Sequence, residues 1–237
     1  MPRSFTETVK GVIYVLSHPK QMKWLWVRET RFRDRKTSKT QWVQWQKYDA
    51  QLHISMMKNY PVSQTESTLN LHRISIFSEM ANSVGKDLTV LDAGCGDGVI
   101  SEPLLKIGNF VTSIELPGII ALAPKNRVPF AVAGDIEQLA CASGIFDLVV
   151  ASEVVEHLWN PEIFFCEAYR VLKDGGYLIV ETPEGEGSLN YDSHRHFFTV
   201  DILERMLVDK FTVSRVERLE ATGSAQTKTI IILFHKS

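Results

Sequence analysis

Apolar runs alternate with helical stretches from Leu88 onward, and this alternation restricts the fold more than any other feature of the chain. Such a pattern is typical of a parallel sheet that is covered by helices on both faces. The strands are expected at Leu88–Asp92, Phe110–Glu115, Phe130–Ala133, Phe146–Ser152 and Tyr177–Glu181. Two more alternating segments, Phe211–Glu220 and Thr227–His235, predict an antiparallel hairpin. The sequence therefore predicts an α/β fold with a doubly wound, mainly parallel sheet of seven strands that ends in an antiparallel C-terminal hairpin.

Two helices in this region have clear signals at their ends. The segment Leu69–Met80 has apolar residues at helical spacing and is closed by Gly85. The segment Asn160–Leu172 begins with a favourable N-cap residue, places Pro161 at the first helical position, and is stopped by Asp174-Gly175-Gly176. These signals predict one helix before the first strand and another between the fourth and fifth strands.

The first 64 residues differ from the rest in charge and in pattern. Residues 1–60 hold 12 Lys or Arg and 4 Asp or Glu, a net charge of +8, whereas the remaining residues hold 14 and 24, so that the whole chain has a net charge of −2. Tryptophans at positions 24, 26, 42 and 45 are spaced like helix faces, and no strand alternation is present. We expect a basic helical N-terminal cap at residues 1–64 and a second domain at residues 65–237.

The charge of the basic cap does not identify what the cap binds. It can attract phosphate, nucleic acid or anionic lipid, but packing against the acidic domain is the commoner fate of such a charged face. Nucleic acid is not the expected partner, because the cap has no clear RNA-binding module. Residues 1–35 combine an apolar face with aromatic and basic neighbours, which is the composition of a peripheral membrane contact. The oligomeric state is not encoded in any motif.

Composition excludes several classes of protein. Cys95, Cys141 and Cys166 have no paired spacing, so that neither a disulfide framework nor a cysteine zinc site is expected. The apolar run Gly11–Leu16 is too short for a signal-peptide core or a membrane span. A cytoplasmic protein, with the membrane contact above as its only link to lipid, is therefore expected.

A glycine-rich turn follows the first predicted strand. The segment Val90–Gly98 ends a buried strand and opens a helix, and its glycines allow a ligand to approach the backbone closely. The dinucleotide fingerprint requires a third small residue at position 99, where this chain has Val99. Asp92 and Asp97 would repel a pyrophosphate, but they suit a cationic ligand. The turn therefore predicts a nucleotide-like cofactor that carries positive charge.

Two acidic positions follow the next two strands. Glu115 lies about 23 positions after Asp92, close to the offset of about 20 at which a carboxylate accepts hydrogen bonds from ribose hydroxyls. Asp135 follows the third strand, where it can accept a hydrogen bond from an adenine amino group while Ile136 lies against the ring. The three elements occur in the order that a nucleoside site requires.

These motifs together resemble class I S-adenosylmethionine (SAM)-dependent methyltransferases, and the most similar subgroup is the ubiquinone-biosynthesis type of small-molecule O-methyltransferase. The resemblance covers about residues 65–237 and implies a Rossmann-like fold with SAM as the cofactor. It is carried by Val90–Gly98, Glu115, Asp135, Phe146–Leu158 and Leu172–Tyr177. The cofactor-binding residues that it implies are Asp92, Gly94, Cys95, Gly96, Glu115, Leu116, Asp135, Ile136 and Ser152.

Acidic residues and a histidine follow the fourth predicted strand. On a helical turn, Glu153, Glu156 and His157 would share one face at the carboxyl end of the sheet. His157 can act as a general base that one of the two carboxylates orients. Alternatively, the three side chains can bind Mg²⁺ or Mn²⁺, with His196 from a later loop as a fourth ligand. The sequence leaves both uses open, together with a purely structural role in hydrogen bonding.

A cluster of bases suits a hydroxyl acceptor, which must lose a proton as it attacks the methyl group. The expected reaction is therefore SAM-dependent O-methylation of a small-molecule, glycan or lipid-linked hydroxyl. The loop from Glu181 to Tyr191, with Gly185 and Gly187, is expected to cover the acceptor. The alternatives are an RNA 2′-O-methyltransferase and a catalytically silent methyltransferase-like binding protein.

Overall fold

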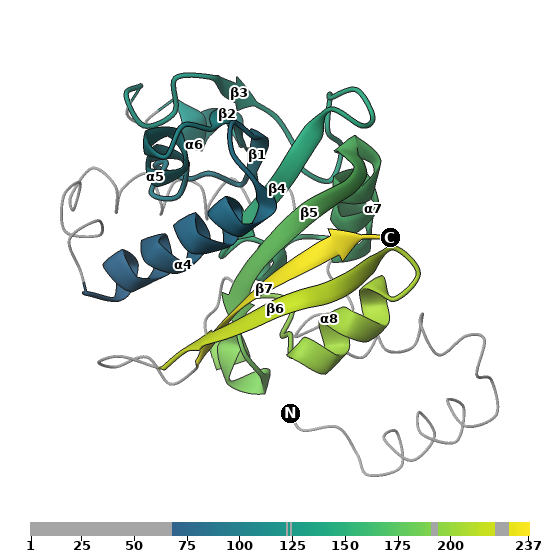
Figure 1. The fold of residues 1–237 in the computed structure, drawn as a ribbon. Coiled ribbons are helices and arrows are strands. Elements are labelled where there is room, and N and C mark those ends of the chain that lie inside the picture. Colours follow the sequence, from purple (N-terminus) through teal and green to yellow (C-terminus); the bar gives the residue numbers. More distant parts are fainter. Residues whose placement is uncertain (1–67, 122, 124, 191–193, 221–227) are drawn as a thin grey trace, which may run out of the picture.

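The fold is described by a computed structural model, which covers residues 68–121, 123, 125–190, 194–220 and 228–237 (Figure 1). The N-terminal cap expected at residues 1–64 lies outside the described residues, and so do Tyr191 and Ser193 of the loop after the fifth strand. The division into a cap and a second domain therefore stays a prediction.

The described part of the chain forms one seven-stranded sheet in the order β3-β2-β1-β4-β5-β7-β6. The β1–β2, β2–β3, β1–β4 and β4–β5 pairs are parallel, whereas β7 is antiparallel to both β5 and β6. The strands are β1 (Thr89–Ala93), β2 (Phe110–Glu115), β3 (Ala131–Ala133), β4 (Phe146–Ser152), β5 (Leu172–Pro183), β6 (Phe211–Leu219) and β7 (Thr229–Lys236). The predicted mainly parallel sheet with a C-terminal hairpin is confirmed.

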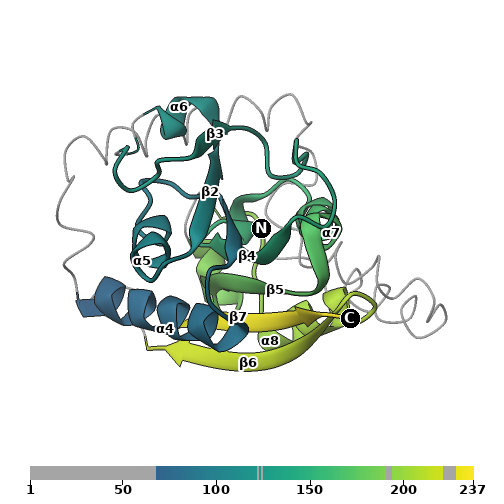
Figure 2. The ribbon, with the colours of Figure 1, turned by 45° about the horizontal axis from the view of Figure 1, so that its top comes forward.

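Helices lie on both faces of the sheet, as the alternating pattern predicts (Figures 1 and 2). The helices are α4 (Thr68–Val84), α5 (Ser101–Lys106), α6 (Pro117–Ile120), α7 (Pro161–Val171) and α8 (Val200–Leu207), with 3-10 turns η2 (Val155–His157) and η3 (Glu186–Asn190). Residues of α4 and α5 belong to one hydrophobic cluster, and residues of α7 and α8 belong to another. Each face of the sheet therefore has its own core.

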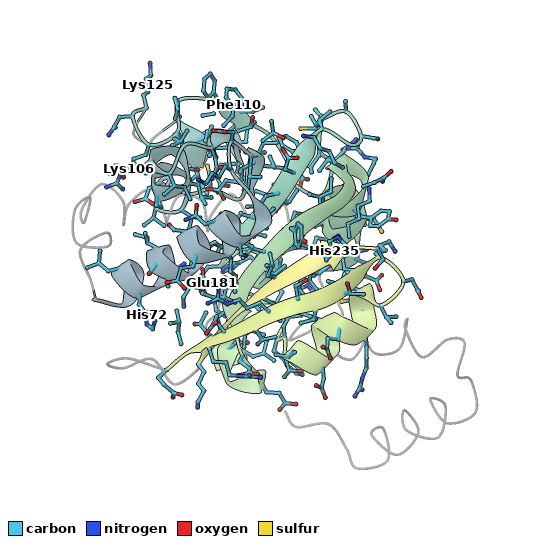
Figure 3. All side chains as sticks on the ribbon, viewed as in Figure 1. His72, Lys106, Phe110, Lys125, Glu181 and His235 are labelled. Carbon is cyan, nitrogen blue, oxygen red and sulfur yellow. The ribbon has the colours of Figure 1, made fainter. Side chains whose placement is uncertain are left out.

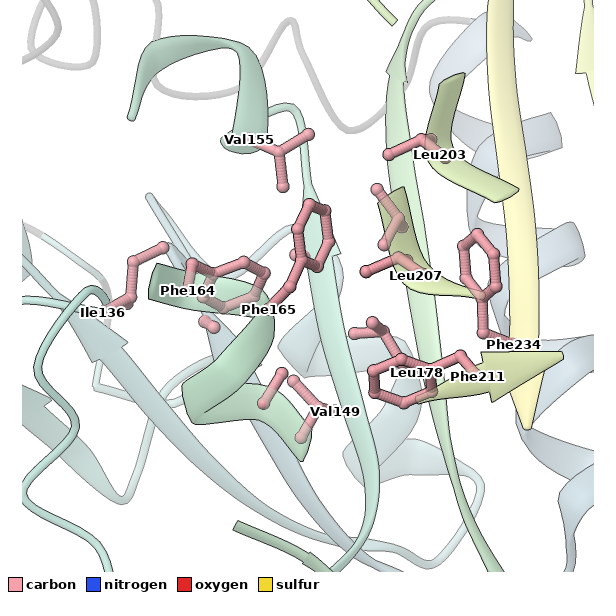
Figure 4. Packing of buried hydrophobic residues seen from close by; sticks show 14 of the residues in the cluster. Ile136, Val149, Val155, Phe164, Phe165, Leu178, Leu203, Leu207, Phe211 and Phe234 are labelled. Carbon is pink, nitrogen blue, oxygen red and sulfur yellow. The ribbon is translucent and has the colours of Figure 1, made fainter. Parts of the chain in front are cut away.

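Successive strand residues alternate between the two cores. Val90 packs with the α4 and α5 side, whereas Leu91 packs with the α7 and α8 side, and Leu148 and Val149 divide in the same way. All four side chains are completely buried, which explains why the central strands are apolar without interruption. Figure 4 shows the second core, in which Phe164 and Phe165 of α7 pack on the sheet.

The fifth strand starts earlier than predicted. It begins at Leu172 rather than Tyr177, because Leu172 pairs with Phe146 before a register shift leads to the pairing of Tyr177 with Leu148. Asn160 and Pro161 occupy the N-cap and first position of α7 as expected, but the Asn160 side chain forms no capping hydrogen bond. The glycines after α7 therefore lie within an irregular strand instead of a separate turn.

The parallel strands all end at one edge of the sheet, so that the segments after β1, β2, β4 and β5 meet there. Among the described residues, no helix is long and apolar enough to cross a membrane.

Candidate active site

The glycine turn after β1 packs directly on the segment after β4. Gly94 has φ +80°, and a Cβ atom at this position would lie 2.5 Å from Cγ2 of Val154. Only glycine satisfies both conditions without strain. The Gly94 amide donates a hydrogen bond to the carbonyl oxygen of Ile114 at 2.8 Å. The predicted cofactor turn and the acidic segment that contains Val154 are therefore in van der Waals contact.

The two acids that flank this turn lie in different surroundings. Asp92 is 1% exposed and accepts a hydrogen bond from the Ser101 hydroxyl, and burial raises the pKa of its carboxyl to about 7. Asp97 instead forms an ion pair with Arg127, with 3.4 Å between Oδ2 and Nη1. Because Arg127 neutralises Asp97, the negative charge that the sequence suggested at the turn is smaller than expected.

Glu115 lies at the end of β2 and contacts the glycine turn. Its Oε2 accepts a hydrogen bond from the amide of Gly96 at 3.0 Å, and its Oε1 accepts one from the amide of Leu116 at 2.6 Å. The carboxylate is thus held over the turn by backbone donors. This position agrees with the one that the resemblance implies for ribose binding, which itself stays a prediction.

The remaining predicted cofactor residues are partly buried in protein contacts. The Asp135 carboxylate accepts a hydrogen bond from the amide of Glu137, whereas Ile136 is 6% exposed and packs in the core with Phe164 (Figure 4). Cys95 is buried, and burial raises the pKa of its thiol well above the ordinary value. Ile136 packs mainly in the core, and the expectation that its side chain also covers an adenine ring stays a prediction.

The acidic segment after β4 is not the regular helical turn that the sequence suggested. Glu153 precedes the 3-10 turn η2 and has φ +53°, a conformation that non-glycine residues adopt mainly where function or packing requires it. Its amide donates a hydrogen bond to the carbonyl oxygen of Glu181 on β5. Burial and the neighbouring carboxylates Glu156 and Glu181 raise the pKa of Glu153 well above its ordinary value. Glu153 therefore lies outside the 3-10 turn that carries Glu156 and His157, although its carboxylate is close enough to Glu156 to be affected by its charge.

Glu156, His157 and His194 come together after β4 and β5, and one potential ligand atom from each lies within 4.8 Å of the others. Oε2 of Glu156 accepts a hydrogen bond from the Thr182 hydroxyl at 3.0 Å, and Oε1 lies 3.8 Å from Nε2 of His157. Burial raises the pKa of Glu156 and lowers the pKa of His194 to about 4. The imidazole ring of His194 is therefore neutral near pH 7, and the neutral ring is the form that binds metals.

His194, rather than the predicted His196, belongs to this group. Nε2 of His196 lies 2.8 Å from the carbonyl oxygen of Leu158 and forms a hydrogen bond with it, so that this ring supports the segment after η2. The backbone amides of Arg195 and His196 both donate to the carbonyl oxygen of Glu156. The sequence contains both histidines, but their spacing alone did not show which ring faces Glu156.

Arg73 of α4, which the sequence did not predict as a site residue, binds side chains near the ends of β4 and β5. Nε and Nη2 of Arg73 on α4 donate to the two carboxylate oxygens of Glu181, each at 2.7 Å, and Nη2 also donates to the Ser152 hydroxyl at 2.9 Å. Glu181, labelled beside α4 in Figure 3, is completely buried. No motif marks Arg73, because a single arginine on a helix is usually a surface residue.

The loop after β5 is closed at its base. The Gly185 amide donates to the carbonyl oxygen of Phe198 at 2.7 Å, and a single bridge joins Glu184 to Phe198. Ser188 and His194 both lie between these closing contacts. The loop that was expected to cover the acceptor begins after Pro183 rather than at Glu181, because Glu181 to Pro183 belong to β5, and His194 lies beyond its predicted end.

Comparison with known proteins shows where the similarity lies. Residues 91–180 match the family model of a methyltransferase domain. This segment of the chain is similar to methyltransferase domains. Outside this match, the described residues complete the same sheet with β6 and β7.

Curated relatives match a similar part of the chain. A ubiquinone biosynthesis O-methyltransferase of Azorhizobium caulinodans is 37% identical over 103 residues, which are 41% of each protein. The enzyme of the same name from Pseudomonas paraeruginosa is 32% identical over 121 residues, 48% of this chain and 51% of the relative. The chain thus aligns with about half or less of these relatives. The predicted resemblance to class I SAM-dependent methyltransferases of this group is confirmed.

Solved structures support the fold. The N-methyltransferase NodS from Bradyrhizobium japonicum in complex with S-adenosylhomocysteine has a TM-score of 0.68 and is 19% identical, over 79% of this chain and 97% of NodS. A Burkholderia thailandensis 1,6-didemethyltoxoflavin-N1-methyltransferase has a TM-score of 0.67 at 17% identity, over 87% of this chain and 94% of that enzyme. At these identities, the likeness extends to the Rossmann-like methyltransferase fold alone.

Proposed function

We propose that the chain transfers a methyl group from SAM to a hydroxyl oxygen of a small-molecule, glycan or lipid-linked acceptor. The contact between Gly94 and Val154 carries this proposal, because it brings the cofactor turn against the segment that holds Glu156 and His157. A methyl donor on the turn would lie beside the side chains that can bind or deprotonate an acceptor. The names of the O-methyltransferase relatives support oxygen as the accepting atom.

The group of Glu156, His157 and His194 fits a divalent cation such as Mg²⁺ or Mn²⁺. Oε1 of Glu156 is buried and has no hydrogen-bond partner among the described residues, although buried polar atoms normally have one. One carboxylate oxygen and two imidazoles form a mixed donor set, in which the carboxylate suits Mg²⁺ or Mn²⁺ and the imidazoles suit softer divalent metals. A bound cation would lower the pKa of the acceptor hydroxyl and orient it.

The residues of the chain would then align the two reactants. The acceptor oxygen attacks the methyl carbon while the bond from carbon to the sulfonium sulfur breaks, and S-adenosylhomocysteine leaves. Glu115 and the glycine turn would hold the donor, and Thr182 fixes Glu156 through its hydroxyl. Without a cation, His157 would take the acceptor proton as a general base.

Methyl transfer by the metal-stripped protein tests the proposal. The protein is incubated with SAM that carries a labelled methyl group and a panel of catechols and other hydroxyl compounds, with and without Mn²⁺. We expect labelled methyl ethers from at least one catechol, and a rate that falls when Glu156 is replaced in Glu156→Gln. Binding of S-adenosylhomocysteine without transfer to any hydroxyl would refute the O-methyltransferase assignment. Transfer that does not respond to Mn²⁺ would support His157 as the base.

A further inference from the structure

Ser188 is a buried polar residue that the reaction outlined above does not use. It lies on η3 (Glu186–Asn190), inside the loop that the Gly185–Phe198 hydrogen bond closes, and its side chain is completely buried. Its hydroxyl oxygen has no hydrogen-bond partner among the described residues. A buried hydroxyl without a partner lowers stability, so that its presence requires an explanation.

The backbone of Ser188 connects it to the histidine group. Its amide donates to the carbonyl oxygen of Gly185 at 3.1 Å, and its own carbonyl oxygen accepts a hydrogen bond from the imidazole of His194. Both backbone groups are therefore satisfied, and only the hydroxyl lacks a partner. Because the Ser188 carbonyl oxygen accepts a hydrogen bond from His194, Ser188 is in direct contact with one of the three candidate ligands.

Two buried oxygens without hydrogen-bond partners among the described residues thus belong to residues that contact the two histidines, Glu156 beside His157 and Ser188 beside His194. Oε1 of Glu156 comes from the segment after β4, and Oγ of Ser188 comes from the loop after β5. Mg²⁺ and Mn²⁺ retain oxygen ligands such as water in addition to protein side chains. A hydroxyl beside such a site can form a hydrogen bond with one of these oxygen ligands.

We propose that Ser188 is a positioning residue of the cation site, whose hydroxyl forms a hydrogen bond with an oxygen ligand of a cation held by Glu156, His157 and His194. This inference rests on the proposed function, because it requires that the group binds a cation. In the absence of the cation, the hydroxyl only reduces stability. The Ser188→Ala variant should therefore bind the cation more weakly without a loss of stability.

The test measures Mn²⁺ binding and thermal unfolding of the metal-free full chain for the parent and for Ser188→Ala. We expect Ser188→Ala to bind Mn²⁺ about 10- to 100-fold more weakly, the usual loss when a group that supports a metal ligand is removed. The melting temperature of the metal-free variant should be unchanged or higher, because no hydrogen bond is lost. Ser188→Thr, which restores a hydroxyl, should recover part of the Mn²⁺ affinity.

Ser83→Ala is the matched control, because the Ser83 hydroxyl donates to the carbonyl oxygen of Met80 on α4 and lies outside the group. It should lower the melting temperature slightly and leave Mn²⁺ binding unchanged. Equal Mn²⁺ affinity of Ser188→Ala and the parent would overturn the role of Ser188 alone. A parent chain that binds no Mn²⁺ would overturn the cation site itself, and Ser188 with it.

Discussion

The two halves of the carboxyl edge of the sheet differ in how far their polar groups are satisfied. On the β1–β2 half, both carboxylate oxygens of Glu115 accept hydrogen bonds from backbone amides, and Asp97 is paired with Arg127. On the β4–β5 half, Glu153 adopts a positive φ, and Oε1 of Glu156 has no hydrogen-bond partner among the described residues. The first half is complete within the protein, whereas the second has capacity for a further ligand.

The difference shows what each half requires. A carboxylate that is already held by amides can receive a neutral sugar without a change in conformation, which reduces the entropy lost on binding. Buried carboxylates with incomplete partners destabilise the protein until an opposite charge arrives. The structure thus combines a preorganised half with a half in which a buried carboxylate oxygen lacks a hydrogen-bond partner among the described residues.

Arg73 supplies positive charge beside the buried carboxylates of the β4–β5 half, and its replacement should lower the stability of the protein more than any other change. Arg73→Gln leaves the completely buried Glu181 without its cation, and we expect the free energy of unfolding to fall by about 3–5 kcal/mol. Urea unfolding followed by circular dichroism measures this loss. Arg215→Gln removes the solvent-exposed ion pairs that Arg215 of β6 forms with Glu79 on α4 and with Glu217, and it should cost at most about 1 kcal/mol. Equal losses for the two variants would contradict the importance of burial.

Gly94 tests the contact that joins the two halves. Gly94→Ala would combine a positive φ with a collision against Val154, and we expect a loss of about 2–4 kcal/mol in unfolding free energy together with weaker binding of S-adenosylhomocysteine. Gly144→Ala is the control, because Gly144 also has positive φ but a Cβ there has no atom within 4 Å. It should cost only about 1–2 kcal/mol. The same loss at both glycines would show that Val154 accommodates the methyl group.

Glu115 tests the preorganised half alone. Glu115→Gln removes the charge that accepts hydrogen bonds, and we expect affinity for S-adenosylhomocysteine to fall about 10- to 100-fold, in the range of charged hydrogen bonds. Calorimetric titration measures the change, with the partly exposed Glu217→Gln as the control. Unchanged affinity would remove Glu115 from the cofactor site.

Asp92 predicts a pH dependence. Its pKa is raised to about 7 by burial, so that the folded state retains a proton that the unfolded chain, with an ordinary value near 3.8, has lost. The stability gained from this proton is full below about pH 4 and is lost as pH rises through 7. Asp92→Asn should therefore make the drop in stability between pH 6 and pH 8 smaller by about 1 kcal/mol. Urea unfolding at both pH values measures it, and an unchanged drop would place the titration elsewhere.

Most of the sheet could be predicted from the sequence because its strands are short and continuously apolar. The observed β2 and β4 have the predicted bounds Phe110–Glu115 and Phe146–Ser152, and the hairpin differs by one or two residues at its ends. The predicted start of β5 at Tyr177 was wrong, because Leu172 already pairs with Phe146 of β4 before the register shift. Local patterns do not contain this long-range pairing.

The candidate site could be predicted only in part, for reasons that differ from residue to residue. Motif spacing located Glu115 and Glu156, since the ends of strands fix their positions. The choice of His194 over His196 depends on the path of an irregular loop, and the role of Arg73 depends on how α4 crosses the sheet. Such tertiary contacts are not visible in the spacing of residues along the chain.

The closed base of the loop after β5 has a consequence for protein engineering. Because the Gly185–Phe198 hydrogen bond and the Glu184–Phe198 bridge fix both ends, changes between them are separated from the pairing of β5 with β7. Positions of this segment other than Ser188 and residues 194–196 can thus be varied in libraries while the scaffold is kept. Selection from such libraries on new hydroxyl compounds would test the expectation that this loop covers the acceptor.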